Sequence, residues 1–212
     1  MTMRVRHHHH GASAPRTNAT VGVGARDEGV ALIEFALVVF LLITLVFGAL
    51  DIGFRWRYSH EAVGASRAGA RIGARLGTDR TTDLNVLSTV RTSLDSVDML
   101  DSLERVIVYR ADSSNGRPPL SCTHEFGPSG PCNVYPASAL TSPPADSNFD
   151  ADGCMITGAT YQNYCPDVRD VDQRDADYVG VMVVLRVGSI TGMYSDSTVQ
   201  RYSVMRMEPT AK

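Results

Sequence analysis

The sequence has little lysine and no dense cluster of positive charge. Only Lys212 is a lysine among the 20 basic residues, and the formal net charge of the 212 residues is −3. Proteins that bind nucleic acid usually carry a basic patch on one face, so we predict no nucleic-acid partner. With 43% apolar residues, the chain is long enough for one membrane segment and one modest folded domain.

The sequence also lacks the common catalytic motifs. It contains no G-x-S-x-G nucleophile elbow, no Walker phosphate loop and no H-E-x-x-H zinc motif. His124 follows Cys122 by two residues, but one such pair in a predicted loop is a weak nucleophile arrangement. We therefore predict a protein that is not an enzyme and that needs no cofactor.

The four cysteines all follow the apolar part of the chain, and none forms a C-x-x-C pair, which disfavours zinc. Four cysteines allow three pairings, and the sequence does not select one. Pairing of sequence neighbours would close two short loops and would indicate export into an oxidising compartment. Four free thiols in a cytoplasmic domain are the alternative. The cysteines are Cys122, Cys132, Cys154 and Cys165.

One long apolar run with a glutamate near its start is the strongest signal in the chain. A helix from Val30 to Gly53 would be about 36 Å long at about 1.5 Å per residue, and a bilayer's hydrocarbon core is about 30 Å thick. Glu34 would then enter the lipid near one end of the span, where an ionisable side chain is unfavourable and indicates function. The alternative is a plain anchor with Glu34 at the headgroup boundary.

The regions on either side of this run differ in character. Residues 1–28 are polar and without apolar periodicity, so we predict disorder; the tract His7–His10 within them carries little information. Residues 51–77 are rich in alanine and free of proline, so we predict that the helix continues to residue 77. Its basic residues fall in one arc of about 80° at about 100° per residue: Arg57, His60, Arg67, Arg71 and Arg75.

Small residues recur at every fourth position near the end of this predicted helix. Gly69, Gly73 and Gly77 have the spacing that lets another helix approach closely. The same spacing would let this helix lie against the chain's own domain. Both interpretations remain open at this stage.

Residues 78–212 are predicted to form an α+β domain with a small antiparallel sheet. Apolar residues recur every three or four positions from Leu84 to Val97, which predicts a helix, and Asp79, Thr81 or Thr82 could cap its start. Alternating apolar residues predict strands at 105–110, 178–187 and 198–207, the last two antiparallel.

Residues 111–176 hold eight of the ten prolines and all four cysteines. This stretch is too long for an ordinary connection, so we interpret it as a disulfide-stapled surface insertion. Near its end, aspartates at positions 167, 170, 172, 175 and 177 alternate with Arg169 and Arg174, which is typical of a solvated surface.

A weak calcium candidate lies inside this stretch. Asn148, Asp150 and Asp152 alternate before Gly153, in the manner of oxygen ligands in a calcium loop. If Asn148 opens a twelve-residue loop, Ala159 occupies the closing position where a bidentate glutamate belongs. A solvated turn is therefore the stronger interpretation, and we assign no metal.

Three stretches of the chain carry a recognisable pattern: Asp27-Glu28-Gly29-Val30-Ala31-Leu32-Ile33-Glu34-Phe35-Ala36-Leu37, Phe47-Gly48 and Ala65-Ser66-Arg67-Ala68-Gly69-Ala70-Arg71. Together they resemble the TadE-like family, which comprises minor pilins or pseudopilins of tight-adherence pilus systems. The resemblance covers about residues 27–75 and implies that a membrane peptidase cuts after Gly29, as in type IV prepilins. Val30 would become the first residue and Glu34 the fifth.

A physical role for Glu34 follows from that cut. The new α-amino group of Val30, with a reference pKa near about 8, would be buried in an apolar bundle, where an unpaired ammonium group is unfavourable. A carboxylate from Glu34 of a neighbouring, axially staggered subunit can neutralise it. Glu34 would therefore set the register between subunits.

The charges flanking the span favour the opposite orientation from a pilin. Within about twenty residues of the span, Arg16 and Arg26 precede it, and four arginines follow it. The positive-inside tendency would thus place the domain in the cytoplasm. We nonetheless expect an extracytoplasmic domain because of the glycine–glutamate spacing and the clustered cysteines. The four arginines are Arg55, Arg57, Arg67 and Arg71.

These features together predict a minor pilin or pseudopilin of a tight-adherence pilus, anchored in the cytoplasmic membrane by one helix over residues 30–77. The resemblance implies as partners the other pilin subunits, the assembly platform proteins, the prepilin peptidase and the lipid bilayer. The alternative is an uncleaved single-pass anchor that carries an extracellular binding domain, with calcium as its candidate ligand.

Overall fold

The structure is a computed structural model, and it describes residues 24–124, 127–189, 192 and 195–209. The chain divides into two compact units, residues 1–46 and residues 47–212. The prediction of disorder for residues 1–23, with the tract His7–His10, lies outside the described residues. For residues 24–28 the prediction was wrong, because they belong to a helix.

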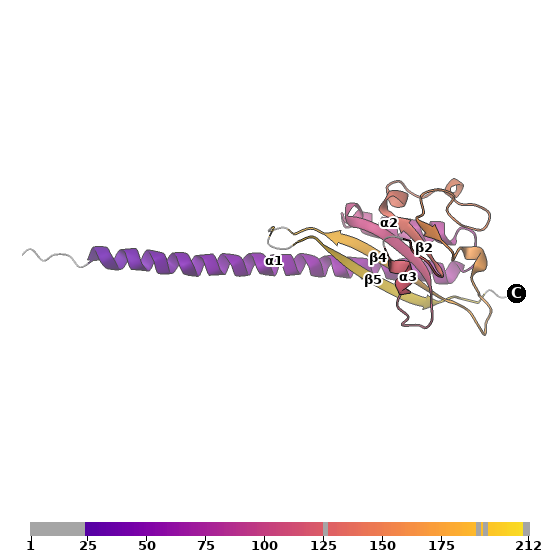
Figure 1. The fold of residues 1–212 in the computed structure, drawn as a ribbon, viewed down its shortest axis with the longest axis horizontal. Coiled ribbons are helices and arrows are strands. Elements are labelled where there is room, and N and C mark those ends of the chain that lie inside the picture. The colour runs from indigo at the N-terminus through magenta and orange to yellow at the C-terminus, as the bar shows by residue number, and fades with distance from the viewer. Residues whose placement is uncertain (1–23, 125–126, 190–191, 193–194, 210–212) are drawn as a thin grey trace, which may run out of the picture. The chain divides into compact units, whose positions relative to one another are not determined.

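Helix α1 runs from Gly24 to Leu76 (Figure 1). It begins before the predicted start at Val30, and it ends within one residue of the predicted end. Gly77 closes it, because this glycine has a φ of 54° and donates its N–H to the carbonyl of Gly73 at 3.0 Å. A left-handed residue at this position is a common helix stop, and glycine adopts it without a steric penalty.

The described residues form a five-stranded sheet in the order β3-β2-β1-β4-β5, in which all neighbouring strands are antiparallel. This confirms the predicted α+β class. The predicted strands at 105–110, 178–187 and 198–207 correspond to β1, β4 and β5. The strands are β1 Leu103–Ala111, β2 Cys132–Pro136, β3 Tyr161–Gln162, β4 Tyr178–Val187 and β5 Ser197–Arg206.

The core lies on both faces of the sheet, which explains why β4 is apolar at successive positions. On one face, alternate valines of β4 pack with helix α2, Thr82–Asp95, and with the part of α1 that belongs to the second unit. On the other face, Met182 and Val184 pack with Tyr109 and with the disulfide between Cys122 and Cys132.

The glycines of α1 pack against the chain's own domain. A Cβ at Gly69 would lie 2.9 Å from a methyl of Val90 and 3.3 Å from one of Val181, and a Cβ at Gly73 would lie 3.3 Å from Val179. The sequence left two interpretations open, and the structure agrees with the one in which this helix lies against the chain's own domain. The face that carries Gly69, Gly73 and Gly77 is buried, so it is not available to a helix of another subunit.

The start of α2 is formed by a local turn. Thr81 is the N-cap residue but makes no side-chain cap bond; instead its amide and its hydroxyl donate to Asp79 at 2.8 Å and 2.6 Å. The hydrogen bond from the hydroxyl has the larger effect, and both lower the pKa of Asp79 below its usual value. The carboxylate therefore orders the turn that joins α1 to α2.

Residues 111–176 are not a surface insertion. Strand β2 pairs with β1 over Arg105–Tyr109, and Val134 and Tyr135 lie in the core. The rest of the stretch adds β3 and several short helices, and its residues Leu140, Phe149 and Met155 are buried. The short helices of the chain are η1 Leu100–Ser102, α3 Leu120–Thr123, η2 Ala137–Leu140, η3 Asp146–Asn148 and η4 Pro166–Val168.

The disulfides join sequence neighbours, one of the three possible pairings. Cys122 pairs with Cys132 across a Cα–Cα distance of 6.2 Å, and Cys154 pairs with Cys165 across 5.3 Å. All four sulfurs are used, since no free cysteine remains. Each bond closes a short loop within the stretch 111–176, as the prediction of a stapled region required.

Candidate functional site

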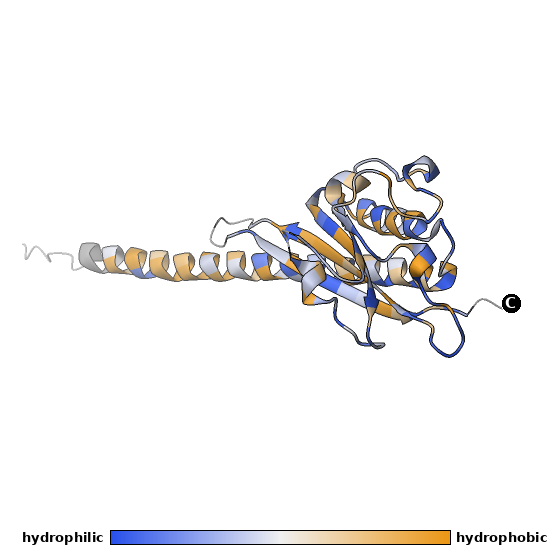
Figure 2. Ribbon diagram, turned by 45° about the vertical axis from the view of Figure 1, so that its right-hand side comes forward, coloured by the Kyte–Doolittle hydropathy of each residue, from blue (hydrophilic) through white to orange (hydrophobic). Residues whose placement is uncertain are grey.

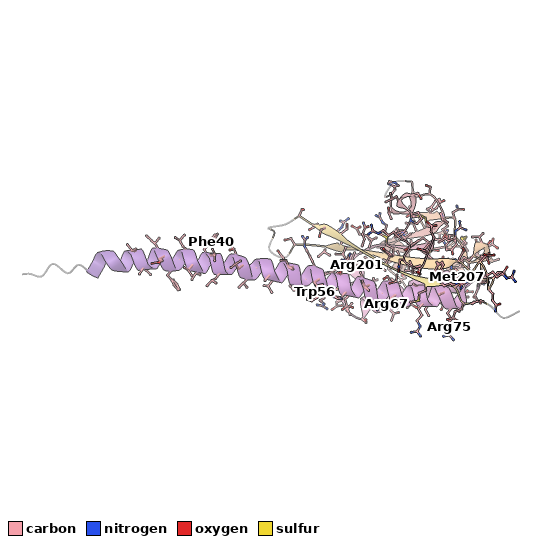
Figure 3. All side chains as sticks on the ribbon, turned by 90° about the horizontal axis from the view of Figure 1, so that it is seen from below. Phe40, Trp56, Arg67, Arg75, Arg201 and Met207 are labelled. Carbon is pink, nitrogen blue, oxygen red and sulfur yellow. A yellow bond between two sulfur atoms is a disulfide. The ribbon has the colours of Figure 1, made fainter. Side chains whose placement is uncertain are left out.

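The apolar part of α1 is exposed over its whole length. Among the described residues, one helix, Gly29–Leu76, is long and apolar enough to cross a membrane, and its most apolar part is not buried against the protein. In Figure 2 the ribbon of this part of α1 carries mostly the colours of hydrophobic residues. Phe40, labelled in Figure 3, is 68% exposed. A single span with this composition needs lipid or other apolar helices around it.

Glu34 is the one charged residue between Gly29 and Leu50. Its side chain is exposed on the same helix as Ile33 and Phe35, which are 66% and 67% exposed. The other strongly polar residue of this stretch is Thr44, whose hydroxyl donates to the carbonyl of Leu41 at 2.8 Å within the helix. Thr44 is thus satisfied locally.

The predicted cleavage position is open. A Cβ built on Gly29 would meet no atom within 4 Å, and Val30 is 64% exposed. Gly29 and Val30 are thus exposed residues within α1.

Beyond Leu50 the character of α1 changes to that of a membrane–water boundary. Trp56 is 68% exposed, and its ring lies 5.1 Å from that of His60. Trp and Tyr side chains collect at bilayer interfaces, where one part of the ring contacts lipid and another contacts water. The aromatic and basic residues from Trp56 onward therefore mark the end of the apolar span.

The predicted basic arc is confirmed as an exposed face of α1. The side chains of its members are solvent-exposed, while Gly69 and Gly73 on the opposite side of the helix are buried. Figure 3 shows Arg67 and Arg75 on this part of the helix. Arg57 contacts the domain by donating to the carbonyl of Val97 at 3.4 Å. The members are Arg57, His60, Arg67, Arg71 and Arg75.

Comparison with protein families gives one match over this helix. Residues 29–71 match the model of the TadE-like protein family. We call them the TadE-like segment. The segment starts at the glycine of the predicted cut, includes Glu34 and the apolar span, and ends within the basic arc at Arg71. No curated protein and no solved structure matches the chain.

The match and the helix together fit a membrane-anchored protein related to the tight-adherence pilus. The TadE-like family is a structural family associated with these pili. The TadE-like segment covers only part of α1, and residues 72–212 lie outside it.

Of the three calcium candidates, Asn148 and Asp150 use their side chains in local hydrogen bonds. Asp150 accepts the backbone N–H groups of Asp152 and Cys154 at 3.0 Å and 2.8 Å, and Asn148 accepts that of Ala145 at 2.8 Å. The bond from Asp152 to Asp150 is that of an Asx turn. In the described part of the chain, no group of three or more His, Cys, Asp or Glu side chains could hold a metal ion.

A buried polar network joins α2 to the stretch 111–176, and sequence reasoning missed it. Asp83 is fully buried and accepts hydrogen bonds from Asn133 at 2.8 Å and from the hydroxyl of Tyr135 at 2.6 Å. Its second oxygen is paired with the guanidinium of Arg169. Arg169 also donates to the carbonyl of Tyr164. The network thus consists of Asp83, Asn133, Tyr135, Tyr164 and Arg169.

The placement of Arg169 corrects an expectation from the sequence. The sequence predicted that Arg169 lies on a solvated surface, but its side chain is buried. The guanidinium donates to the carbonyl of Tyr164 at 3.0 Å and lies 4.9 Å from the centroid of that tyrosine ring. Asp170, Asp172 and Asp175 are exposed as predicted. A signal was present in the sequence: Asp83 continues the apolar stripe of Val86, Leu87, Val90 and Leu94 on α2.

Three buried tyrosines should control unfolding at high pH. Burial, which removes water from the ionised form, raises the pKa of Tyr109, Tyr135 and Tyr164 above the usual value. These phenols stay protonated in the folded chain but ionise at about pH 10 when the chain is unfolded. The free energy of unfolding is therefore retained below that pH and decreases above it. Each contributes a loss of about 1.4 kcal/mol per pH unit.

Absorbance of tyrosinate during an alkaline titration checks this prediction. We expect one group of tyrosines to ionise while the circular dichroism of the folded chain is unchanged, and the three buried ones to ionise only as the fold is lost. Ionisation of all tyrosines in one step, with the fold intact, would show that burial does not hold these phenols neutral.

Proposed function

We propose that this chain is a minor pilin or pseudopilin of a tight-adherence pilus. The observation that carries the proposal is the match of residues 29–71 to the TadE-like family over a helix whose apolar surface is exposed. In this role α1 anchors the chain in the cytoplasmic membrane, and the folded domain lies on the extracytoplasmic side. The chain acts by assembling with other proteins and not by catalysis.

The exposed helix supplies the assembly surface in this proposal. The peptidase cuts the exposed Gly29–Val30 bond, and the new ammonium group of Val30 enters an apolar bundle. Glu34 of an adjacent subunit provides the opposite charge, because an unpaired ammonium group in such surroundings is unfavourable. With Thr44 satisfied within its own helix, Glu34 is the remaining polar group of the span that requires a partner.

The two disulfides support an extracytoplasmic domain. Disulfides persist in oxidising compartments and are rare in the cytoplasm, and all four cysteines of this chain are paired. The disulfides cross-link β2 and the segments that follow it. Export would place this part of the fold in the oxidising compartment that disulfides require. The charge bias across the span points the other way, and the orientation therefore needs a direct test.

Co-purification tests the proposed function. The full chain is extracted with detergent from cells that make the pilus, and the proteins that come with it are identified by mass spectrometry. We expect other pilin subunits and assembly platform proteins. A chain that is abundant in the membrane but brings neither would be a simple anchor, and the proposal would be wrong.

Thiol labelling tests the orientation of the domain. The native sulfurs are paired and mostly buried, so the probe is a cysteine placed at the exposed Ser113, Ser113→Cys. In spheroplasts, a membrane-impermeant maleimide should label this cysteine without lysis. The same treatment of a reduced cytoplasmic thiol protein is the control and should give no label until the cells are opened. Labelling of this chain only after lysis would place the domain in the cytoplasm.

A further inference from the structure

The two edges of the sheet are protected very differently. Strand β3 at one edge is only two residues long, and the side chain of its Gln162 bonds both the N–H and the carbonyl of Met155, at 2.6 Å and 2.7 Å. Strand β5 at the other edge is ten residues long, and within the described residues no strand pairs with its outer side. A long edge strand presents a row of unpaired backbone groups to other chains.

A groove runs along this open edge. It has a volume of about 460 Å³, and its floor is four consecutive residues of β5, Tyr202–Met205. Arg67 of α1 lines one side, and the turn residues Ser114 and Asn115 line the other. Residues of the edge strand, of α1 and of the turn after β1 therefore line one groove.

The walls of the groove define its chemistry. Arg67 is exposed, and in the part of the chain that the structure describes no carboxylate pairs with it. Figure 3 shows Arg67 on α1 and Arg201 on the adjoining strand β5. Neither the lining residues nor the sequence of β5 includes an acidic residue. The groove is therefore polar, positively charged and without a counter-charge of its own.

We propose that this groove binds an extended segment of another protein, which adds as a sixth strand beside β5 and places a carboxylate against Arg67. The main-chain bonds of the added strand would use the outer edge of Tyr202–Met205, and the Asp or Glu side chain would give specificity, as in other strand-addition complexes. This inference depends on the geometry of the domain and not on the proposed pilin role.

The charges disfavour a second copy of this chain as the occupant. Antiparallel pairing of two β5 strands about their centres would bring the arginines at positions 67 and 201 of both copies together, and β5 offers no acidic residue to offset them. Like charges opposite each other in a sheet are destabilising. A partner strand with a carboxylate fits the groove better than β5 of another copy does.

The test uses the full chain in detergent micelles and two synthetic peptides of about ten residues. Both peptides alternate valine and threonine; one carries a central aspartate and the other a central lysine. We expect the acidic peptide to bind at least about threefold more tightly, the scale of one exposed ion pair. Arg67→Glu should reverse the order of the two peptides. Arg71→Glu, one turn further along the exposed face, should leave the order unchanged.

Amide hydrogen exchange locates the bound peptide in the same samples. Protection that appears within Tyr202–Met205 on addition of the acidic peptide is the expected result. Absence of binding by both peptides at millimolar concentration, equal effects of Arg67→Glu and Arg71→Glu, or protection elsewhere would overturn the proposal. Protection of the same residues without peptide, increasing with protein concentration, would instead show pairing between copies and would also overturn it.

Discussion

Replacing Asp83 with asparagine is expected to lower the free energy of unfolding by about 3–5 kcal/mol. The substitution keeps the shape of the side chain but removes its charge, and it leaves the guanidinium of Arg169 buried without a counter-charge. Both side chains of the pair are fully buried, so water cannot replace the lost partner. The hydroxyl of Tyr135 and the amide of Asn133 also lose a charged acceptor.

Urea unfolding of the full chain in detergent, with the disulfides intact, measures this effect. Asp95→Asn is a matched control on the same helix, because its partner Arg91 is 3.9 Å away and Asp95 is 60% exposed. An exposed pair of this kind contributes at most about 1 kcal/mol. The double change of Asp83 to leucine and Arg169 to methionine should recover only part of the lost stability, because it removes both buried charges but leaves the hydroxyl of Tyr135 and the amide of Asn133 without their acceptor. Equal, small effects of Asp83→Asn and Asp95→Asn would contradict the role given to the pair.

Replacing Glu34 with glutamine is expected to abolish co-purification of the chain with other pilin subunits. Glutamine has nearly the same size and remains polar, so insertion and the amount of protein in the membrane should not change. The charge that neutralises the Val30 ammonium group of a neighbour is lost, and that group would remain buried and unpaired. The loss should therefore affect assembly alone.

Thr44→Val is the matched control for this experiment. It changes the other strongly polar residue of the apolar span, whose hydroxyl bonds only to its own helix, and co-purification should be retained. If Glu34→Gln retained its pilin partners as fully as Thr44→Val does, Glu34 would have no role in register, and a plain membrane anchor would explain the helix.

Elements with a strong local pattern were predictable from the sequence. Strand β4 is apolar at nearly every position and was predicted with its observed bounds, 178–187. Helix α1 was predicted nearly to its last residue, because proline is absent and Gly77 provides a stop. Both patterns depend on residues close together in the chain, which is where periodicity carries information.

The parts that were missed depend on contacts between distant segments. Strand β2 has five residues and β3 only two, so neither shows a recognisable period, and both were hidden in a stretch rich in proline and cysteine. Arg169 and Asp83 are 86 residues apart, and only the folded chain brings them together. The packing of Gly69 and Gly73 could be decided only once Val90, Val179 and Val181 were placed against them.

The mass of the intact protein extracted from membranes tests the central claim most directly. The account predicts a chain that begins at Val30 in cells that contain the prepilin peptidase, and a longer chain that begins upstream of Gly29 in cells that lack it. The free amine at Val30 is what gives Glu34 its role between subunits. Functional material that still begins at Met1 in the presence of the peptidase would contradict the account.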